Sequence, residues 1–357
     1  MSAGKTMLVM AGGTGGHIMP ALAVANILRA EGWRVVWMGN ADAMEGRLVP
    51  QNGYDTAWIT FGALRGKGLM RKLLLPLNLL RGFAQAFVQL REVRPNVVLG
   101  FGGYVTFPGG MMAALLGRPF VIHEQNSIAG LANKVLARIA DRVLTGFPNA
   151  LKASRWVGNP VRAEIASLSA PEQRFAGRSG PLRVLVVGGS LGAQALNETV
   201  PKAVALMAEA HRPNVIHQSG EKHLDGLKKN YTAANVAVHA DCIAFIDNMA
   251  AAYADADVVI CRSGALTVAE LAAAGCASVL VPFPHAVDDH QTGNAKFLSD
   301  SGAAILLPQN EMTPRRLADL LEEMTRESLL EMARRARNLA KPDAASVVAT
   351  ACKEIAR

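Results

Sequence analysis

Short apolar runs alternate with helical stretches along the whole chain. The runs are five to seven residues long and almost continuously apolar, as in strands that are buried on both faces of a sheet. The helical stretches between them include 190–209, 264–275 and 313–324. The pattern predicts strands at 7–12, 34–39, 96–102, 119–124, 141–146, 182–188, 214–219, 236–240, 257–262, 278–283 and 303–308.

This alternation predicts an α/β fold with parallel sheets that helices cover on both faces. With 357 residues, the chain is longer than one hydrophobic core usually supports. A polar stretch with prolines and glycines, 159–181, separates two halves that are built alike, and we expect it to act as a linker. We therefore expect two Rossmann-like domains, 1–160 and 161–340, whose sheets face each other across a cleft and bind ligands at the carboxyl ends of their strands.

Composition narrows the class of protein. The four cysteines are scattered and form no C-x-x-C pair, so we expect neither a disulfide framework nor a zinc site. No apolar run approaches the ~18 residues that span a bilayer, and no apolar leader precedes the first strand, which favours a cytoplasmic protein. The formal net charge of +8 favours an anionic partner and leaves nucleotide, nucleic acid and membrane surface open.

Two glycine-rich turns, within 10–20 and 183–193, each follow a strand and precede a helix. The first lacks the third glycine of the dinucleotide-binding fingerprint, because Ile18 occupies that place, and neither second strand ends in the acidic residue that binds the ribose of NAD. Close packing of a helix on a strand, without a ligand, is the alternative explanation of a single such turn. A further cluster at 261–270 begins a helix after a strand and so offers backbone amides and a helix dipole to a diphosphate.

Seven motifs follow one another along the chain: GGTGGH (12–17), GGYVTFPGG (102–110), HEQN (123–126), GNPVR (158–162), GGSLGA (188–193), RSGALTVAE (262–270) and DDHQTGNA (288–295). In this order they resemble those of the family 28 GT-B glycosyltransferases that transfer N-acetylglucosamine from UDP-N-acetylglucosamine (UDP-GlcNAc) in peptidoglycan synthesis. The resemblance implies an inverting, metal-independent hexosyltransferase without a cofactor, which joins the sugar to the 4-hydroxyl of MurNAc in undecaprenyl-diphosphoryl-MurNAc-pentapeptide. It implies that the first domain binds this acceptor and the membrane, that the second binds UDP-GlcNAc, and that the C-terminal helix, 341–357, packs back on the first.

The resemblance also assigns binding roles in both halves. Glu270 is a plausible ribose ligand, because a carboxylate one turn into a helix can accept both ribose hydroxyls while the helix start holds phosphate. The alternative for Ser190 is a helix N-cap, although the glycines around it favour contact with a ligand. Without the resemblance, Asn126 is equally a turn residue, and a surface charge is the preferred interpretation of Arg162. The acceptor-binding positions are Gly103 and Tyr104, and the UDP-GlcNAc-binding positions are Thr14, Gly15, Gly16, Asn126, Arg162, Ser190, Ile246, Ala265, Leu266, Thr267, Val268, Ala269, Glu270 and Gln291.

An inverting transfer needs a base that takes the proton of the attacking acceptor hydroxyl. His17 follows the first glycine turn at the start of a helix, whose dipole favours the neutral imidazole. Glu124, at the end of a strand of the same half, is the second candidate. We expect His17 to be the base, and a role in capping the turn or binding the donor sugar is the alternative.

A D-x-D pair, Asp255 and Asp257, matches the metal-binding motif of metal-dependent glycosyltransferases. The pair lies where a helix is expected to end and a strand to begin, a place where aspartate is common. Helix N-termini and arginines can neutralise a diphosphate instead, so we expect no metal at this pair.

Between Asp55 and Glu92 the chain has no acidic residue. Its leucine-rich helical part, 68–90, is more apolar than packing on a sheet requires, although part of it must pack in that way. The stretch therefore predicts peripheral binding to an anionic membrane surface, the cytoplasmic face of the plasma (inner) membrane. Nucleic acid is disfavoured because the stretch has few aromatic residues and no nucleic-acid motif. The basic residues are Arg65, Lys67, Arg71, Lys72, Arg81 and Arg91.

Two other functions fit parts of the sequence. A UDP-GlcNAc 2-epimerase shares the two Rossmann-like domains but needs neither a membrane surface nor a second substrate. Release of UDP that depends on a lipid-linked acceptor separates the two enzymes. A non-catalytic nucleotide-sugar-binding protein would bind without turnover. The sequence leaves open the oligomeric state and other cell-wall synthesis proteins as partners.

Overall fold

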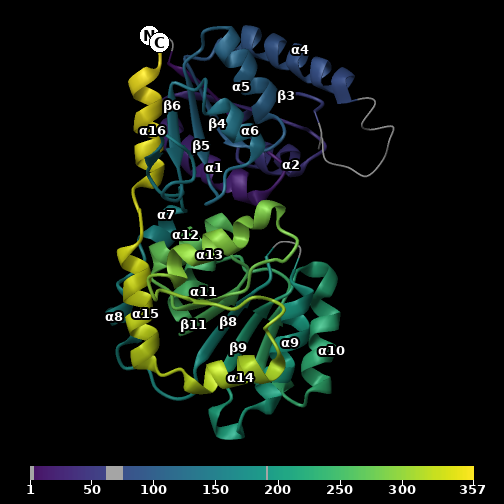
Figure 1. Cartoon of the computed structure of the whole chain (residues 1–357), viewed down its shortest axis with the longest axis vertical. Helices are drawn as coiled ribbons and strands as arrows, with labels where there is room; N and C mark the ends of the chain where they lie inside the picture. Colours follow the sequence, from purple (N-terminus) through teal and green to yellow (C-terminus); the bar gives the residue numbers. More distant parts are fainter. Residues whose placement is uncertain (1–3, 62–74, 190–191) are drawn as a thin grey trace. The chain divides into compact units, whose positions relative to one another are not determined.

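The structure, a computed structural model, describes residues 4–61, 75–189 and 192–357 (Figure 1). The chain divides into two compact units. Unit 1 consists of Met1–Arg162 and Lys341–Arg357, and unit 2 of Ala163–Ala340. Each unit is built on a parallel β-sheet with helices around it, so the predicted α/β class with two Rossmann-like domains is confirmed.

The sheet of unit 1 has seven strands in the order β3-β2-β1-β4-β5-β6-β7, and its pairs are parallel. The central strands β1 and β4 are almost entirely buried and apolar, which is why continuous apolar runs predict them. The short edge strands β3 and β7 do not follow from that pattern. The strands are β1 (Thr6–Ala11), β2 (Arg34–Gly39), β3 (Asp55–Trp58), β4 (Val97–Gly102), β5 (Phe120–Glu124), β6 (Arg142–Thr145) and β7 (Arg155–Trp156).

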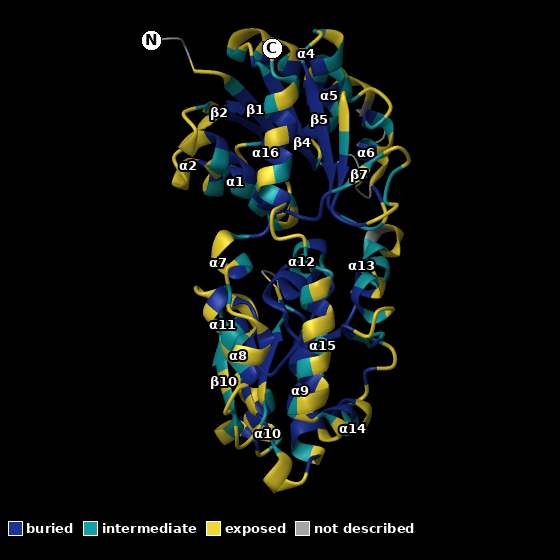
Figure 2. Ribbon diagram, turned by 90° about the vertical axis from the view of Figure 1, so that its left-hand side faces the viewer, coloured by how far each residue is buried: buried dark blue, intermediate teal, exposed yellow. Residues whose placement is uncertain are grey.

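Helices cover both faces of this sheet, and Figure 2 shows the buried strands between partly exposed helices. On one face α1 packs against α16, and Leu28 and Val348 join one apolar core. The core on the other face includes Leu8, Ala86 and Ala113, from β1, α4 and α5. The helices are α1 (Gly15–Ala30), α2 (Met44–Gln51), α4 (Leu75–Val93), α5 (Thr106–Leu115), α6 (Leu131–Leu136) and α16 (Ala344–Ile355).

The sheet of unit 2 has six strands in the order β10-β9-β8-β11-β12-β13, again with parallel pairs. Its core joins Val186 of β8 and Ile260 of β11 to Leu196, Leu317 and Leu329 of three surrounding helices. The strands are β8 (Arg183–Val187), β9 (Asn214–Gln218), β10 (Ala240–Ile243), β11 (Val258–Cys261), β12 (Ser278–Leu280) and β13 (Ile305–Leu306). The α-helices are α7 (Ala163–Ala166), α8 (Pro171–Phe175), α9 (Gln194–Leu206), α10 (Leu224–Ala233), α11 (Met249–Asp255), α12 (Ala265–Ala274), α13 (His290–Ser299), α14 (Pro314–Glu323) and α15 (Arg326–Asn338).

Two expectations from the apolar pattern are wrong in unit 2. The strand expected at 236–240 begins only at Ala240, because the residues before it form a short 3₁₀ helix in which Val238 is 91% exposed. In the sequence, this exposed valine contributes to an apolar run that looks like a buried strand. The linker expected at 159–181 instead contains α7 and α8, and the latter packs into unit 2 through buried Phe175.

The strand order reverses at one place in each sheet, between β1 and β4 in unit 1 and between β8 and β11 in unit 2. Connections from such neighbouring strands leave on opposite sides of the sheet, which opens a crevice at their carboxyl ends. Both glycine turns lie there, since residues 12–16 follow β1, and Gly188 and Gly189 directly follow β8. These two edges are the candidate sites.

Two buried histidines generate a prediction for the pH dependence of stability. Burial lowers the pKa of His217 in unit 2 to about 3 and that of His123 in unit 1 to about 4, from an ordinary value of 6.5. Below pH 6.5 the unfolded chain therefore binds more protons than the folded chain. We predict that, as the pH falls from about 6.5 to about 4, each histidine lowers the free energy of unfolding of its unit by about 1.4 kcal/mol per pH unit.

Denaturant titrations at several pH values measure this slope. His217→Gln should remove one histidine's share of it, whereas His211→Gln, at an exposed position, should leave it unchanged. Equal slopes for the wild type and both variants would contradict the prediction.

Candidate functional site

The first glycine turn is bonded to a buried carboxylate of the protein itself. Gly13 has a left-handed backbone (φ 87°), and its N–H donates to Oε2 of Glu45 at 2.9 Å. The N–H of Asn40 donates to Oε1 of the same carboxylate at 3.1 Å, and Glu45 is 1% exposed. The amide that would face a phosphate in a dinucleotide-binding fold is therefore occupied. No sequence signal marks Glu45, because it resembles an ordinary acidic residue in the first turn of α2.

His17 lies in the first turns of α1, next to the glycines. Its Nδ1 is 3.2 Å from the carbonyl oxygen of Gly12 and 3.2 Å from Oγ1 of Thr14. The other edge of the ring, with Nε2, lies against Gly102 at the end of β4, where a Cβ would stand 3.2 Å from it. The predicted residues Thr14 and His17 thus meet, and Gly15 begins the helix between them.

The predicted acceptor-binding residues adjoin the same turn. A side chain at Gly103 would overlap the carbonyl oxygen of Gly12, so the turn after β4 requires a glycine there. The ring of Tyr104 lies beside Gly13, 3.7 Å from the point where a Cβ would stand, and 45% of this residue is exposed. The edge at β1 and β4 therefore presents an exposed aromatic ring beside the first glycine turn.

Glu124, the second candidate base, is buried at the end of β5 and accepts four hydrogen bonds. Oε1 accepts from the backbone N–H and from Nδ2 of Asn126, at 2.9 and 3.3 Å. Oε2 accepts from the N–H of Gly130 at 3.2 Å and from Nδ2 of Asn133 at 2.7 Å. The carboxylate thus orders the loop that carries Asn126, and each oxygen is engaged by two donors. Sequence reasoning missed Asn133, which belongs to none of the glycine-rich motifs.

The second glycine turn, in unit 2, is held by a neutral side chain. Oε1 of buried Gln218 accepts from the N–H of Gly189 at 3.1 Å, and Nε2 donates to the carbonyl oxygens of Gly189 and Ala244 at 3.1 and 3.0 Å. Gln218, at the end of β9, therefore has the place in unit 2 that Glu45 has in unit 1. A neutral amide leaves a turn open to an anion, whereas a carboxylate repels one. Ser190, the predicted contact in this turn, lies outside the described residues.

The helix α12 begins after β11, the neighbour of β8, and carries the predicted residues from Ala265 to Glu270. Its N-cap residue is Gly264, which has no side chain to accept from the first amides of the helix. The helix dipole stabilises an anion at such an N-terminus. Further along the helix, Glu270 is 6% exposed and accepts a hydrogen bond from the hydroxyl of Tyr253 at 3.3 Å.

The loop before α13 orients Gln291. Its Oε1 accepts from the N–H of Phe283 at 2.9 Å, which leaves its NH₂ group as the donor. Asp288 and Asp289 both have left-handed backbones, with φ 53° and 52°, a strained conformation that persists mainly at functional sites. Arg262, whose pKa burial lowers, donates to two carbonyl oxygens at the start of this loop. Sequence reasoning did not assign Arg262, although it opens one of the motifs.

Two predicted residues have less defined surroundings. Ile246 is 8% exposed, in the loop after β10 whose Ala244 accepts from Gln218. Arg162 is half-buried and is the last residue of the first segment of unit 1. The structure thus brings Thr14, His17 and Tyr104 together in unit 1. The binding roles of Ile246 and Arg162 stay predictions.

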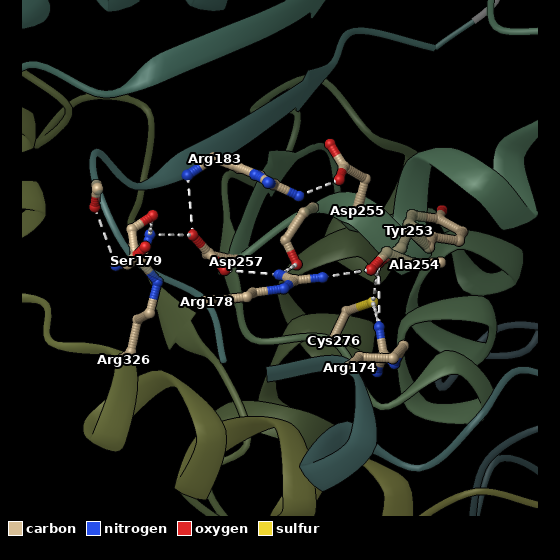
Figure 3. Close-up of polar contacts among 12 residues, drawn as sticks. Arg174, Arg178, Ser179, Arg183, Tyr253, Ala254, Asp255, Asp257, Cys276 and Arg326 are labelled. Atoms are coloured by element: carbon tan, nitrogen blue, oxygen red, sulfur yellow. Dashed lines mark hydrogen bonds and ion pairs between the residues drawn. The ribbon is translucent and has the colours of Figure 1, made fainter. Parts of the chain in front are cut away.

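Asp255 and Asp257 are bound by arginines (Figure 3). The buried carboxylate of Asp257 accepts from Arg178 at 2.5 Å, from Arg326 at 3.2 Å and from the backbone N–H of Arg183 at 2.9 Å. Asp255 pairs with the side chain of Arg183. Both aspartates precede β11 and so lie at the amino edge of the sheet, away from the glycine turns. Within the described part of the chain, no group of three or more His, Cys, Asp and Glu residues could hold a metal ion.

This chain is similar to known proteins along almost its whole length. The model of the glycosyltransferase family 28 N-terminal domain matches residues 7–145, and that of the family 28 C-terminal domain matches residues 183–348. A protein of Dechloromonas aromatica (strain RCB) is 65% identical over 99% of this chain and 99% of its own length. A protein of Azoarcus sp. (strain BH72) is 68% identical over 99% and 98%. Both are named UDP-N-acetylglucosamine–N-acetylmuramyl-(pentapeptide) pyrophosphoryl-undecaprenol N-acetylglucosamine transferase.

Solved structures agree as well. The crystal structure of Acinetobacter baumannii MurG superimposes with a TM-score of 0.86 at 42% identity, covering 98% of this chain and 99% of that chain. The glycosyltransferase of kitacinnamycin, at 16% identity and a TM-score of 0.70, shares the fold alone. The chain therefore belongs to glycosyltransferase family 28 and has the GT-B fold that its motifs predict.

Proposed function

We propose that this chain transfers N-acetylglucosamine from UDP-GlcNAc to a lipid-linked N-acetylmuramyl-pentapeptide and releases UDP. The names of its curated relatives describe this reaction for proteins that are 65% and 68% identical along almost the whole chain. The structural observation that carries the proposal is the difference in charge between the two side chains that hold the glycine turns. Glu45 is a carboxylate in unit 1, and Gln218 is a neutral amide in unit 2.

This difference assigns the donor diphosphate to unit 2. Two like charges 4 Å apart repel by about 4 kcal/mol at the effective dielectric constant of a protein surface, so the turn beside Glu45 is unfavourable for phosphate. The turn beside Gln218 and the N-terminus of α12 favour it. Glu270 then serves the ribose hydroxyls, and the NH₂ group of Gln291 serves a sugar hydroxyl.

We assign the acceptor to unit 1, with His17 as the base. The acceptor oxygen attacks the anomeric carbon, the bond from that carbon to the diphosphate oxygen breaks, and Nε2 of His17 takes the hydroxyl proton. The four donors on Glu124 favour His17 over Glu124 for this step. Tyr104 and Gly103 adjoin the same turn and would contact the acceptor.

Thr14, Gly15, Gly16, Asn126 and Arg162 would reach the donor from unit 1. The leaving diphosphate requires positive potential, which backbone amides and the dipole of α12 supply. Because arginines occupy Asp255 and Asp257, we propose that the reaction is metal-independent.

A lipid-linked acceptor implies a membrane surface for unit 1. The described helices include none that is long and apolar enough to cross a membrane. On α4, Leu77 and Leu80 are 63% and 66% exposed beside exposed Arg81, and Leu115 at the end of α5 is 71% exposed. Because α4 packs against α5, these side chains suit peripheral binding to anionic lipid. The basic residues Arg65, Lys67, Arg71 and Lys72 lie outside the described residues.

The assignment of the diphosphate predicts the effect of Gln218→Glu. This change places beside the second glycine turn the charge that Glu45 carries at the first, so UDP should bind at least about tenfold more weakly. Uridine, which has no phosphate, should bind almost as it does to the wild type. Titration calorimetry measures both ligands. Unchanged UDP affinity would refute the assignment, and an equal loss for uridine would show general damage to the site.

The assignment of the base predicts the effect of His17→Ala. The kcat for transfer to a soluble acceptor analogue should fall by about 10²–10⁴, whereas UDP affinity should change only a few-fold because the nucleotide is assigned to unit 2. Glu124→Gln is the comparison, since it keeps the size of the side chain. Near-normal kcat for His17→Ala, together with a large loss for Glu124→Gln, would move the role to Glu124.

The membrane assignment predicts weaker vesicle binding when Leu77 and Leu80 are both replaced by glutamine. Vesicles that contain phosphatidylglycerol should be bound at least about tenfold more weakly, because two exposed apolar side chains no longer enter the lipid. Arg81→Gln should weaken binding by about 1 kcal/mol, and less at high salt. Leu206→Gln in unit 2, where the leucine is 50% exposed, is the matched control and should bind normally. Unchanged binding by the double variant would rule out this surface.

A further inference from the structure

One peptide group, between Gly12 and Gly13, is hydrogen-bonded at both ends to side chains that are distant in sequence. Its N–H, from Gly13, donates to Oε2 of Glu45 at 2.9 Å. Its carbonyl oxygen, from Gly12, is 3.2 Å from Nδ1 of His17. A trans peptide group directs its N–H and its C=O to opposite sides. Glu45 and His17 are therefore joined through this peptide.

The carbonyl end of this peptide decides which ring nitrogen of His17 carries the proton. A carbonyl oxygen has only lone pairs, so it bonds to Nδ1 only when Nδ1 carries hydrogen. Oγ1 of Thr14, also 3.2 Å from Nδ1, can either donate or accept and does not discriminate. With the proton on Nε2 instead, the lone pair of Nδ1 would face the lone pairs of Gly12. The neutral ring therefore keeps its lone pair on Nε2.

The amide end of the peptide strengthens this preference. A carboxylate that accepts from an N–H polarises the peptide and makes its carbonyl oxygen a better acceptor. The carboxylate of Glu45 is held in one orientation for this bond, because its Oε1 accepts from the N–H of Asn40 at 3.1 Å while its Oε2 accepts from Gly13. The backbone is shaped around it, since a side chain at Gly12 would overlap the carboxylate and one at Gly39 would stand 2.7 Å from Cγ.

We propose that Glu45 is a positioning residue, which acts through the peptide between Gly12 and Gly13 to hold His17 with its proton on Nδ1 and its lone pair on Nε2. The contacts run from Glu45 through the peptide to the imidazole of His17. They hold the ring proton on Nδ1, which a base requires if its Nε2 is to receive a proton. The effect of Glu45 on catalysis rests on the proposed function, in which His17 is the base. The orientation of the ring proton can be measured without catalysis.

The experiment is ¹⁵N NMR of protein labelled at histidine, with the His17 signals assigned from the spectrum of His17→Gln. The wild type at a pH where the ring is neutral should show hydrogen on Nδ1. In Glu45→Gln the side chain has one oxygen and an NH₂ group, which must face the N–H of Gly13 or of Asn40, donor against donor. The population with hydrogen on Nε2 should then rise, and kcat should fall by no more than the factor of about 10²–10⁴ that a general base contributes, with the KM for UDP-GlcNAc nearly unchanged.

Asp42→Asn is the matched control. It removes the same charge from the loop just before α2, three residues before Glu45. Asp42 is exposed, and its backbone N–H, not its carboxylate, donates to Oδ1 of Asn40, so the ring proton and kcat should both stay as in the wild type. A purely structural role of Glu45 predicts a less stable Glu45→Gln whose His17 keeps its proton on Nδ1.

The outcomes separate this inference from the proposed function. Hydrogen on Nε2 in the wild type overturns the inference without any variant, even if Glu45→Gln does not fold. An unchanged ring proton in folded Glu45→Gln overturns it as well. A displaced proton with normal kcat supports the positioning role of Glu45 and rejects His17 as the base.

Discussion

The backbone N–H of one glycine in each unit, Gly13 in unit 1 and Gly189 in unit 2, donates a hydrogen bond to a side chain. The charge of that side chain determines which ligand each candidate site suits. In unit 1 the acceptor is the carboxylate of Glu45, and in unit 2 it is the amide oxygen of Gln218. The two side chains come from the same side of the first strand, although one belongs to a helix and the other to a strand. Glu45 lies shortly after β2, the neighbour of β1, and Gln218 ends β9, the neighbour of β8. The same architecture is thus used twice, with a negative charge in one copy and none in the other.

This single difference separates the two halves of a glycosyl transfer. A nucleotide sugar is a dianionic ligand and needs a turn that is free of negative charge, next to a helix N-terminus such as that of α12. The lipid-linked acceptor also carries a diphosphate, which we expect to bind away from the turn beside Glu45. Its attacking hydroxyl is neutral and needs a base with a defined lone pair. In unit 1 the buried carboxylate of Glu45 fixes the turn next to His17, and the buried carboxylate of Glu124 orders the loop after β5. The carboxylates of Glu45 and Glu124 therefore both have structural partners, and the imidazole of His17 is the group suited to move a proton.

The sequence predicted the fold well because its signals are local. Continuous apolar strands such as β1 and β4, and glycines after them, identify parallel sheets and the edge where ligands bind. The motifs also assigned roles to His17, Tyr104 and Gln291, and these roles stay predictions. The prediction failed where apolar residues lie outside a sheet, as at exposed Val238, and where a polar stretch folds onto a core, as at Phe175. Residues such as Glu45 and Gln218 could not be predicted, since their roles depend on which distant backbone amide they reach.

The central claim is that the diphosphate of the donor binds unit 2 and that the glycine turn of unit 1 excludes it. A crystal structure of the full chain with UDP tests this most directly. The account predicts the diphosphate between the second glycine turn and the first amides of α12, with the N–H of Gly13 still bonded to Glu45. A diphosphate bound at the N–H of Gly13, with the carboxylate of Glu45 displaced, would contradict it.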